Sequence, residues 1–151
     1  MQLQAGRIVT LQQTPLFGGI RDDVLAFLLA QCGEVRVPQG ASFFREGDAA
    51  ESMFVLEAGS VEVRRRGGSG EIVLCRLGCG ACFGEMALID LSPRSATVQA
   101  LEDCRALEVF AASLFSVYER DLEQFTLIQM NIARELSRRL RLADERSASR
   151  R

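Results

Sequence analysis

Residues 83–97 of the chain read FGEMALIDLSPRSAT, and this stretch decides the fold. Gly84 permits a tight turn and leaves a backbone N–H unshielded, and residues 85–89 are long enough for one or two helical turns. The N–H groups that open such a turn carry partial positive charge and attract anions. Pro93 then fixes the approach of the chain to Arg94, whose planar guanidinium can grip a phosphate. The stretch therefore predicts a cradle for one phosphodiester.

Three neighbours extend this prediction. Ser95 adds a hydroxyl donor, and the small Ala96 allows close access to its backbone amide. Glu85 would repel a phosphate directly, so its carboxylate is better explained as the acceptor for a sugar hydroxyl a short distance away. A phosphate site beside a hydroxyl site indicates a ribose phosphate.

Alternating polar and apolar residues dominate the chain from residue 34 to residue 110. Segments such as SVEVR at 60–64 and TVQAL at 97–101 have the period of a half-buried strand, and glycines separate such segments. The pattern predicts a mainly β fold, an antiparallel jelly roll of about eight strands. Parallel βαβ units are disfavoured, because no amphipathic helix of adequate length lies between the strands.

Helical periodicity appears on both sides of the predicted strands. Asp22 and Asp23 precede an apolar run that Gly33 is expected to end, which predicts one short N-terminal helix. Farther on, we expect a short helix over 112–120 and a longer one over 122–143. The apolar residues of the longer helix share one face, which either packs on the β domain or pairs with its copy in a second chain. They are Leu122, Phe125, Ile128, Ile132, Leu136 and Leu140.

A length of 151 residues suits one domain whose core needs no disulfide. We therefore expect a single domain over the whole chain. Its parts are an N-terminal helical segment at 1–33, the jelly roll at 34–110, two C-terminal helices within 111–143 and a basic tail at 144–151.

The composition excludes many enzyme classes. The chain has no His, and its 18 basic residues are all arginines. Serine–histidine and cysteine–histidine catalysis, histidine–zinc sites, Schiff-base chemistry and P-loops are therefore ruled out. Because the guanidinium binds carboxylates and phosphates but does not transfer protons at neutral pH, we expect a binding protein without catalysis.

Charge and cysteine content bear on partners and compartment. Residues 134–151 hold seven Arg against three acids in a chain whose net charge is −2. Such a segment can attract nucleic acid or anionic membrane, but we favour a solvated helix end that complements the helix dipole. The N-terminus lacks the basic start and apolar run of a signal peptide, and the five cysteines fit reduced thiols. We expect a cytoplasmic protein without membrane attachment.

The whole pattern resembles cyclic nucleotide-binding domains from about Leu16 to Ala143. The strongest element is FGEMAL followed by PRSAT, which looks like the phosphate-binding cassette of that family. The resemblance also includes Gly40, the turn at 46–48, the corner at 59–60, and the run GCGACFGE at 78–85.

The resemblance implies a role for each cassette residue. Arg94 would pair with the cyclic phosphate with support from Ser95, and Glu85 would hold the ribose 2′-hydroxyl. Leu74 and Cys75 occupy strand positions that face the ligand in relatives. The implied ligand-binding residues are Gly84, Glu85, Met86, Ala87, Arg94, Ser95, Ala96, Leu74 and Cys75.

The resemblance further implies a sensor of a 3′,5′-cyclic purine nucleotide that needs no cofactor or metal. Movement of the C-terminal helix would carry the signal, through a homodimer or an unknown output protein. The family's transcription regulators continue into a helix-turn-helix, whereas this sequence stops after the long helix, so we expect no DNA-binding domain. Ser95 is compatible with cGMP. In the catabolite activator pattern a pair of hydroxyl groups on the long helix meets adenine, and Ala143 and Asp144 stand at those positions here. We slightly favour cAMP.

Two alternatives stay open. The cassette could be empty, with Arg94 paired to Glu85 at the surface of a structural dimerisation module. The cysteines Cys75, Cys79 and Cys82 have the C-x-x-x-C-x-x-C spacing of some iron–sulfur sites and could also hold zinc, as a thiol or metal sensor. Residues 64–66 are three consecutive arginines before a glycine-rich turn, which predicts the edge of a hairpin.

Overall fold

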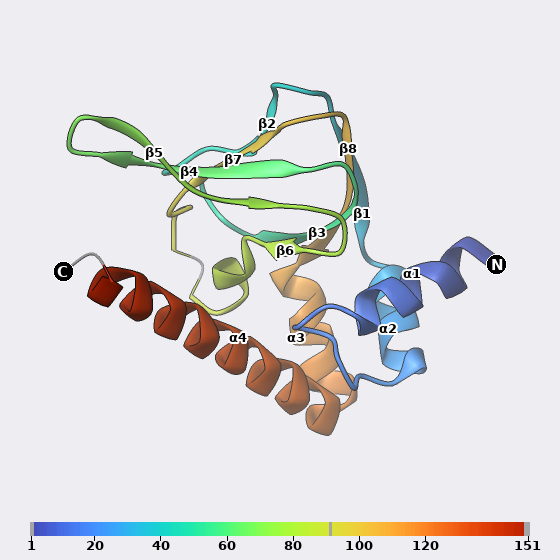
Figure 1. The fold of residues 1–151 in the computed structure, drawn as a ribbon. Helices are drawn as coiled ribbons and strands as arrows, with labels where there is room; N and C mark the ends of the chain where they lie inside the picture. The colour runs from blue at the N-terminus through green and yellow to red at the C-terminus, as the bar shows by residue number, and fades with distance from the viewer. Residues whose placement is uncertain (1, 91, 150–151) are drawn as a thin grey trace.

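The computed structural model describes residues 2–90 and 92–149. Its strands form two four-stranded antiparallel sheets that face each other (Figure 1). One sheet has the order β1-β8-β3-β6, with bounds Gly33–Val37, Cys104–Phe110, Ser52–Ala58 and Cys82–Phe83. The other has the order β2-β7-β4-β5, with bounds Ser42–Phe44, Thr97–Ala100, Val61–Gly67 and Gly70–Leu77. The predicted mainly β jelly roll of eight strands is confirmed.

Strand β3 shows why the first sheet is the centre of the molecule. Its residues 52–56 are all buried, so both of its faces are covered. Met53 and Val55 face a core shared with the helices, whereas Phe54 and Leu56 belong to the core between the sheets. A run without polar alternation is what a strand buried on both faces requires.

Four α-helices pack on the side of the first sheet that faces away from the second (Figure 1). They are α1 (Gln2–Gln12), α2 (Asp22–Leu29), α3 (Ala111–Arg120) and α4 (Leu122–Ser149). Ile128 and Ile132 of α4 are buried in the shared core, as the predicted apolar face requires. Leu122 and Leu140 were predicted on the same face, but they are 59% and 65% exposed, because the helix turns them away from the core. The long helix extends six residues past its predicted end, into the segment expected to be a basic tail; residues 150 and 151 of that tail lie outside the described residues.

The N-terminal segment differs from the prediction. It contains two helices, since α1 precedes the predicted helix α2. The helix α2 also ends at Leu29, and Gly33 begins β1 instead of ending the helix. Helix α1 is held by tertiary contacts: Leu11 is buried, and the Arg7 guanidinium pairs with Glu57 at 3.0 Å and Glu34 at 3.2 Å.

The corner between β3 and β4 depends on Gly59. Its φ is +96°, and a Cβ there would lie 2.7 Å from both the carbonyl oxygen of Asp103 and the Sγ of Cys104. Only glycine fits this left-handed and crowded position. In the described part of the chain, no helix has the length and apolar character needed to cross a membrane.

Candidate functional site

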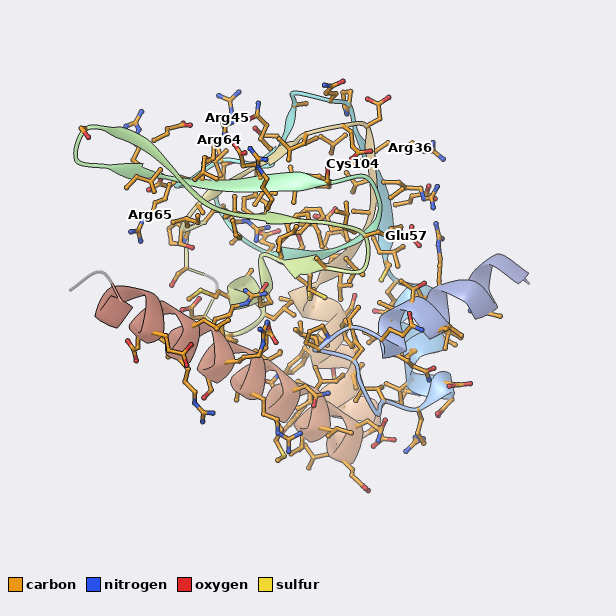
Figure 2. The ribbon with its side chains drawn as sticks, viewed as in Figure 1. Arg36, Arg45, Glu57, Arg64, Arg65 and Cys104 are labelled. Carbon is orange, nitrogen blue, oxygen red and sulfur yellow. The ribbon has the colours of Figure 1, made fainter. Side chains whose placement is uncertain are left out.

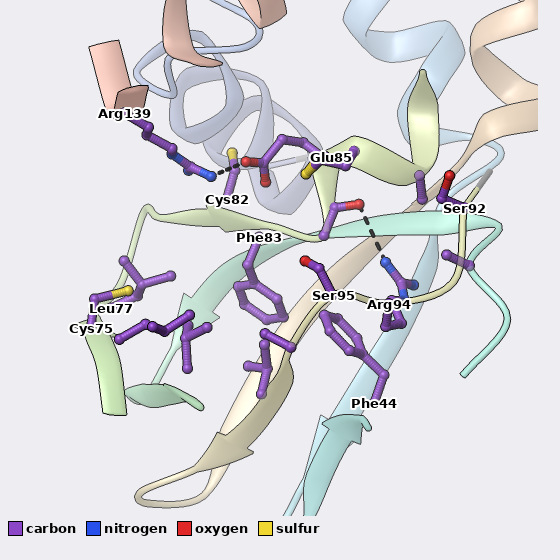
Figure 3. Close-up of a pocket in the computed structure, with 18 of the residues that line it drawn as sticks. Phe44, Cys75, Leu77, Cys82, Phe83, Glu85, Ser92, Arg94, Ser95 and Arg139 are labelled. Atoms are coloured by element: carbon purple, nitrogen blue, oxygen red, sulfur yellow. Dashed lines mark hydrogen bonds and ion pairs between the residues drawn. The ribbon is translucent and has the colours of Figure 1, made fainter. Parts of the chain in front are cut away.

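A cavity of about 710 Å³ opens between the second sheet, the cassette and the C-terminal half of α4 (Figure 3). Its walls come from β5, from the segment Cys82–Ala87, from residues 92–96 and, on α4, from Arg138, Arg139, Leu142 and Ala143. Segments far apart in sequence therefore meet at one place, and all nine residues predicted to bind ligand line this cavity.

Glu85 begins η1, the short 3₁₀ helix Glu85–Leu88 that follows β6. The turn into this helix requires Gly84, whose φ is +78°. A Cβ at this glycine would lie 2.6 Å from Nη1 of Arg94, so the missing side chain also lets the guanidinium approach. The carbonyl oxygen of Gly84 accepts hydrogen bonds from Ala87 N at 3.2 Å and from Arg94 Nη1 at 3.3 Å.

Arg94 is buried at the other side of the cavity and is fixed by its backbone. Its N–H donates to the carbonyl oxygen of Asp48 at 2.8 Å, and its carbonyl oxygen accepts from Gly47 N at 2.8 Å. Its guanidinium carbon lies 4.0 Å from the centre of the Phe44 ring, a cation–π arrangement. The Phe44 ring in turn packs on Phe54, with ring centres 5.9 Å apart. The charged group is thus held on an aromatic support.

Arg94 forms no ion pair within the described residues, and the charges of Glu108 and Asp48 offset only part of the effect of its burial. Its Nε is buried without a hydrogen-bond partner there, and burial lowers the pKa of Arg94 from its ordinary value. A buried positive charge without a paired anion carries a desolvation cost. The arrangement suits a group that arrives with a negative charge.

Glu85 pairs with Arg139 of α4, not with Arg94 (Figure 3). The surface pair between Arg94 and Glu85 considered from the sequence is therefore wrong. The Glu85 side chain is 2% exposed, and burial raises its pKa while the charge of Arg139 offsets part of that effect. Oxygen Oε1 accepts from Arg139, whereas Oε2 is buried without a hydrogen-bond partner among the described residues.

Glu135 links the same arginine to the helix. The Arg139 guanidinium also donates to Glu135 one turn earlier at 3.2 Å, and Arg138 pairs with that carboxylate at 2.5 Å. The hydrogen bond from Arg138, together with the two positive charges, holds the pKa of Glu135 below its usual value. The arginines near the end of α4 were interpreted as complements to the helix dipole, but Arg139 reaches across to the cassette.

Sequence reasoning missed several residues that line the cavity. Arg139 and Phe44 are the most important, and Leu142 adds an apolar contact from α4. The sequence has no local signal for Arg139, because the burial of Glu85 that favours a cationic partner is visible only in the fold. Its identity follows from the tertiary structure, which joins residues 54 positions apart.

The clustered cysteines occupy different environments. Cys75 is exposed and lines the cavity, Cys79 donates to the carbonyl oxygen of Glu57 at 3.0 Å, and Cys82 is buried. Burial raises the pKa of Cys82 to about 12. Across residues 2–90 and 92–149, no three His, Cys, Asp or Glu side chains are grouped so that they could hold a metal ion.

Comparison with known proteins supplies the deciding observation. The sequence model of the cyclic nucleotide-binding domain matches residues 34–121, more than half of the chain. The chain belongs to the cyclic nucleotide-binding domain family. The resemblance found in the cassette is therefore confirmed, and the cavity described above lies between the cassette and the other elements of this domain.

Relatives of known function include the cyclic AMP receptor protein of Thermus thermophilus. It is 33% identical over 135 residues, which are 89% of this chain and 61% of that protein. The crystal structure of the Thermus thermophilus catabolite activator protein superimposes with a TM-score of 0.78 over 89% of this chain and 62% of that chain. A cyclic nucleotide-binding domain of Methylobacillus flagellatus, 20% identical, has the same fold, with a TM-score of 0.86 over 99% of this chain and 85% of that one. The chain spans less than two thirds of the length of the Thermus protein.

Proposed function

We propose that the protein is a non-catalytic cytoplasmic receptor for a 3′,5′-cyclic purine nucleotide, with cAMP slightly favoured, and that α4 carries the signal. The observation that carries this proposal is the pair of unsatisfied groups in one cavity. Oε2 of Glu85 and Nε of Arg94 are both buried without partners among the described residues. Buried polar atoms are rarely left in this state, so a ligand that bonds to both is expected.

The cassette supplies the groups that a cyclic phosphate needs. Arg94 contributes a buried positive charge, and Ser95 and Ala96 line the cavity beside it. A phosphodiester has one negative charge and several acceptor oxygens, so it would offset the desolvation of the guanidinium. The backbone amides around Gly84, Met86 and Ala87 add further donors at the start of η1.

The two oxygens of Glu85 allow ligand and α4 to bind at the same time. Oε1 accepts from Arg139, and Oε2 is directed to no protein donor in the described chain. A ribose 2′-hydroxyl that donates to Oε2 would further stabilise the ionised carboxylate, whose pKa is raised by burial. Ligand and Arg139 then favour the same ionised state, so each strengthens the binding of the other.

This coupling makes α4 the moving part. Arg138, Arg139, Leu142 and Ala143 form one wall of the cavity. A ligand that binds more tightly when this wall is closed shifts the helix toward that state. A tenfold difference in affinity between open and closed states corresponds to about 1.4 kcal/mol. Nothing in this cycle requires chemistry on the nucleotide.

The apolar part of the α4 wall, which also includes Arg138 and Arg139, supports adenine over guanine. Leu142 and Ala143 line the cavity and offer hydrocarbon but no side-chain hydrogen bonds. Guanine carries a carbonyl oxygen and a ring N–H that adenine lacks, and these groups cost free energy when they are buried without partners. The Ser95 hydroxyl is the group that could serve guanine instead, and it lines the same cavity.

The outer side of α4 supports a homodimer. Leu122, Met130 and Leu140 are 59%, 47% and 65% exposed. At 100° per residue they lie within about 80° around the helix axis, so they form one stripe that a second copy of α4 could cover. Sedimentation should give a dimer for the wild-type protein and a monomer for Met130→Glu; a wild-type monomer would contradict this part of the proposal.

Thermal melting with cAMP, cGMP and AMP tests the proposed function. At about 100 times the dissociation constant, a ligand of the folded state adds about 2.7 kcal/mol, a rise of roughly 5 to 11 °C for this length. AMP lacks the cyclic phosphodiester and should give a much smaller shift. Arg65→Ala is the matched control for Arg94→Ala, since it removes an exposed arginine that does not line the cavity. The absence of a shift with either cyclic nucleotide at millimolar concentration would refute the receptor.

A further inference from the structure

The second sheet carries another cavity of about 640 Å³, separate from the nucleotide cavity. Its walls come from β2, β4 and β7 and from the turn at residues 45–47. Ser42, Thr97 and Gln99 line it together with charged side chains, and every lining residue is polar or glycine. This composition differs from that of the nucleotide cavity, whose lining includes Phe44, Val63, Leu74 and Leu77.

Three arginines contribute positive charge to this cavity. Arg64 is already engaged, since its guanidinium pairs with Glu62 at 2.6 Å and with Glu71 at 3.4 Å. Arg45 and Arg66 have no ion pair with any described residue. Two guanidinium groups are therefore available to an anion at the same cavity.

The backbone around these arginines is fixed before any ligand binds. The N–H of Arg45 donates to Oδ2 of Asp48 at 2.9 Å, and the N–H of Glu46 donates to Oγ1 of Thr97 at 2.9 Å. The N–H of Arg66 donates to Oε1 of Glu46 at 3.0 Å, which ties β4 to the turn. A ligand would thus bind without paying to order the loop that holds Arg45 and Glu46.

The chemistry of the walls limits the ligand. The guanidinium groups match the geometry of phosphate oxygens. The carboxylates of Glu46 and Glu71, the Ser42 hydroxyl and the Gln99 amide match sugar hydroxyls, which both donate and accept hydrogen bonds. A nucleobase or acyl chain is disfavoured, because the cavity has no aromatic or aliphatic wall.

We propose that this outer cavity is a second binding site, and that it takes a phosphorylated sugar or polyol. Arg45 and Arg66 bind the phosphate, and the neighbouring carboxylates bind the hydroxyl groups. The site shares no lining residue with the nucleotide cavity. The control is available in the same strand: Arg65 is adjacent to Arg66 but does not line the cavity, and it lies on the opposite side of β4 from Arg64 and Arg45 (Figure 2).

Titration calorimetry with glucose 6-phosphate, glucose and inorganic phosphate tests the proposal on the full chain. Glucose 6-phosphate should bind saturably, and each of Arg45→Ala and Arg66→Ala should weaken it by about tenfold or more, as expected for a charge-assisted hydrogen bond. Arg65→Ala should leave the affinity within about twofold. All three side chains are exposed, and the melting temperature of each variant shows whether it folds.

Each other outcome overturns a stated part of the proposal. If glucose 6-phosphate does not bind at millimolar concentration, the outer cavity is not a binding site for phosphorylated sugars. Equal losses in Arg65→Ala and Arg66→Ala would indicate attraction to overall charge alone. Equal affinities for inorganic phosphate and glucose 6-phosphate would refute the recognition of hydroxyl groups. Loss of binding in Arg94→Ala would place the ligand in the nucleotide cavity.

Discussion

Removing the positive charge of Arg139 should destabilise the protein through a carboxylate on the opposite side of the cavity. The Glu85 side chain is 2% exposed and that of Arg139 is 42% exposed. Breaking a fully buried ion pair costs about 3–5 kcal/mol, and breaking an exposed one costs at most about 1 kcal/mol. Since only one partner is buried here, Arg139→Met should lower the free energy of unfolding by about 1–3 kcal/mol. The melting temperature should then fall by about 2–12 °C.

The loss should depend on pH in a defined direction. Burial already raises the pKa of Glu85 above its unfolded value. The ionised carboxylate therefore opposes folding at pH above the unfolded pKa. Without Arg139 the pKa of Glu85 rises further, and the destabilisation is fully present at pH above this folded pKa. It shrinks as the pH falls through the folded pKa of Glu85, where the carboxyl becomes neutral. The part of the loss that arises at Glu135, whose pKa is lowered, also disappears toward acid.

Arg138→Met is the matched control for Arg139→Met. Arg138 is adjacent and 60% exposed, and its ion pair is with Glu135. Glu135 is buried as well, but it keeps Arg139 as a second partner at 3.2 Å when Arg138 is removed, so the loss should cost less, at most about 1 kcal/mol. Chemical denaturation of both variants, of Glu85→Gln and of the double variant Glu85→Gln/Arg139→Met gives the coupling energy between residues 85 and 139. A coupling energy near zero, or equal losses in the two arginine variants, would refute the reasoning.

Three further outcomes follow from the cavity. Arg94→Ala should weaken cyclic nucleotide binding by about 2–4 kcal/mol in calorimetry, because it removes a buried charge-assisted contact, while unchanged affinity would mean that the phosphate binds elsewhere. The 2′-deoxy analogue of cAMP should bind about 1.5–3 kcal/mol more weakly than cAMP, and equal affinity would remove Glu85 from the ribose contact. Saturating cyclic nucleotide should protect Cys75 from a thiol reagent in mass spectrometry but leave Cys79 reactive, since both are exposed and only Cys75 lines the cavity; equal labelling with and without ligand would contradict this placement.

The β domain could be predicted from the sequence because its signals are local. Alternation, glycine turns and the cassette residues each act over a few positions, and all nine predicted ligand-binding residues do line one cavity. The left-handed turn at Gly84 is an example, since glycine is the residue that adopts it without strain.

Helix α1 could not be predicted, because the contacts that stabilise it are not local in the sequence. It contains Gly6 and the β-branched residues 8–10, which are poor helix formers, and lacks an acidic first turn. Its stability comes from Leu11 in the core and from Arg7 at Glu57, contacts that only the folded chain creates. Tertiary packing overrides weak local propensity in such segments.

The same argument explains why the site was only partly predicted. Glu85 and Arg94 belong to one short motif, but the cation that meets Glu85 comes from α4 and the ring that supports Arg94 comes from Phe44 on β2. Seven arginines near the C-terminus look alike in sequence. Packing of α4 against the β domain brings Arg139 to the cassette.

The most direct test of the account is calorimetric titration of the wild-type protein with cAMP and with cGMP. The account predicts saturable binding of one cyclic nucleotide per chain, with cAMP bound at least as tightly as cGMP and AMP bound far more weakly. If neither cyclic nucleotide binds saturably at millimolar concentration, the buried Glu85 and Arg94 do not form a nucleotide site, and the central claim is wrong.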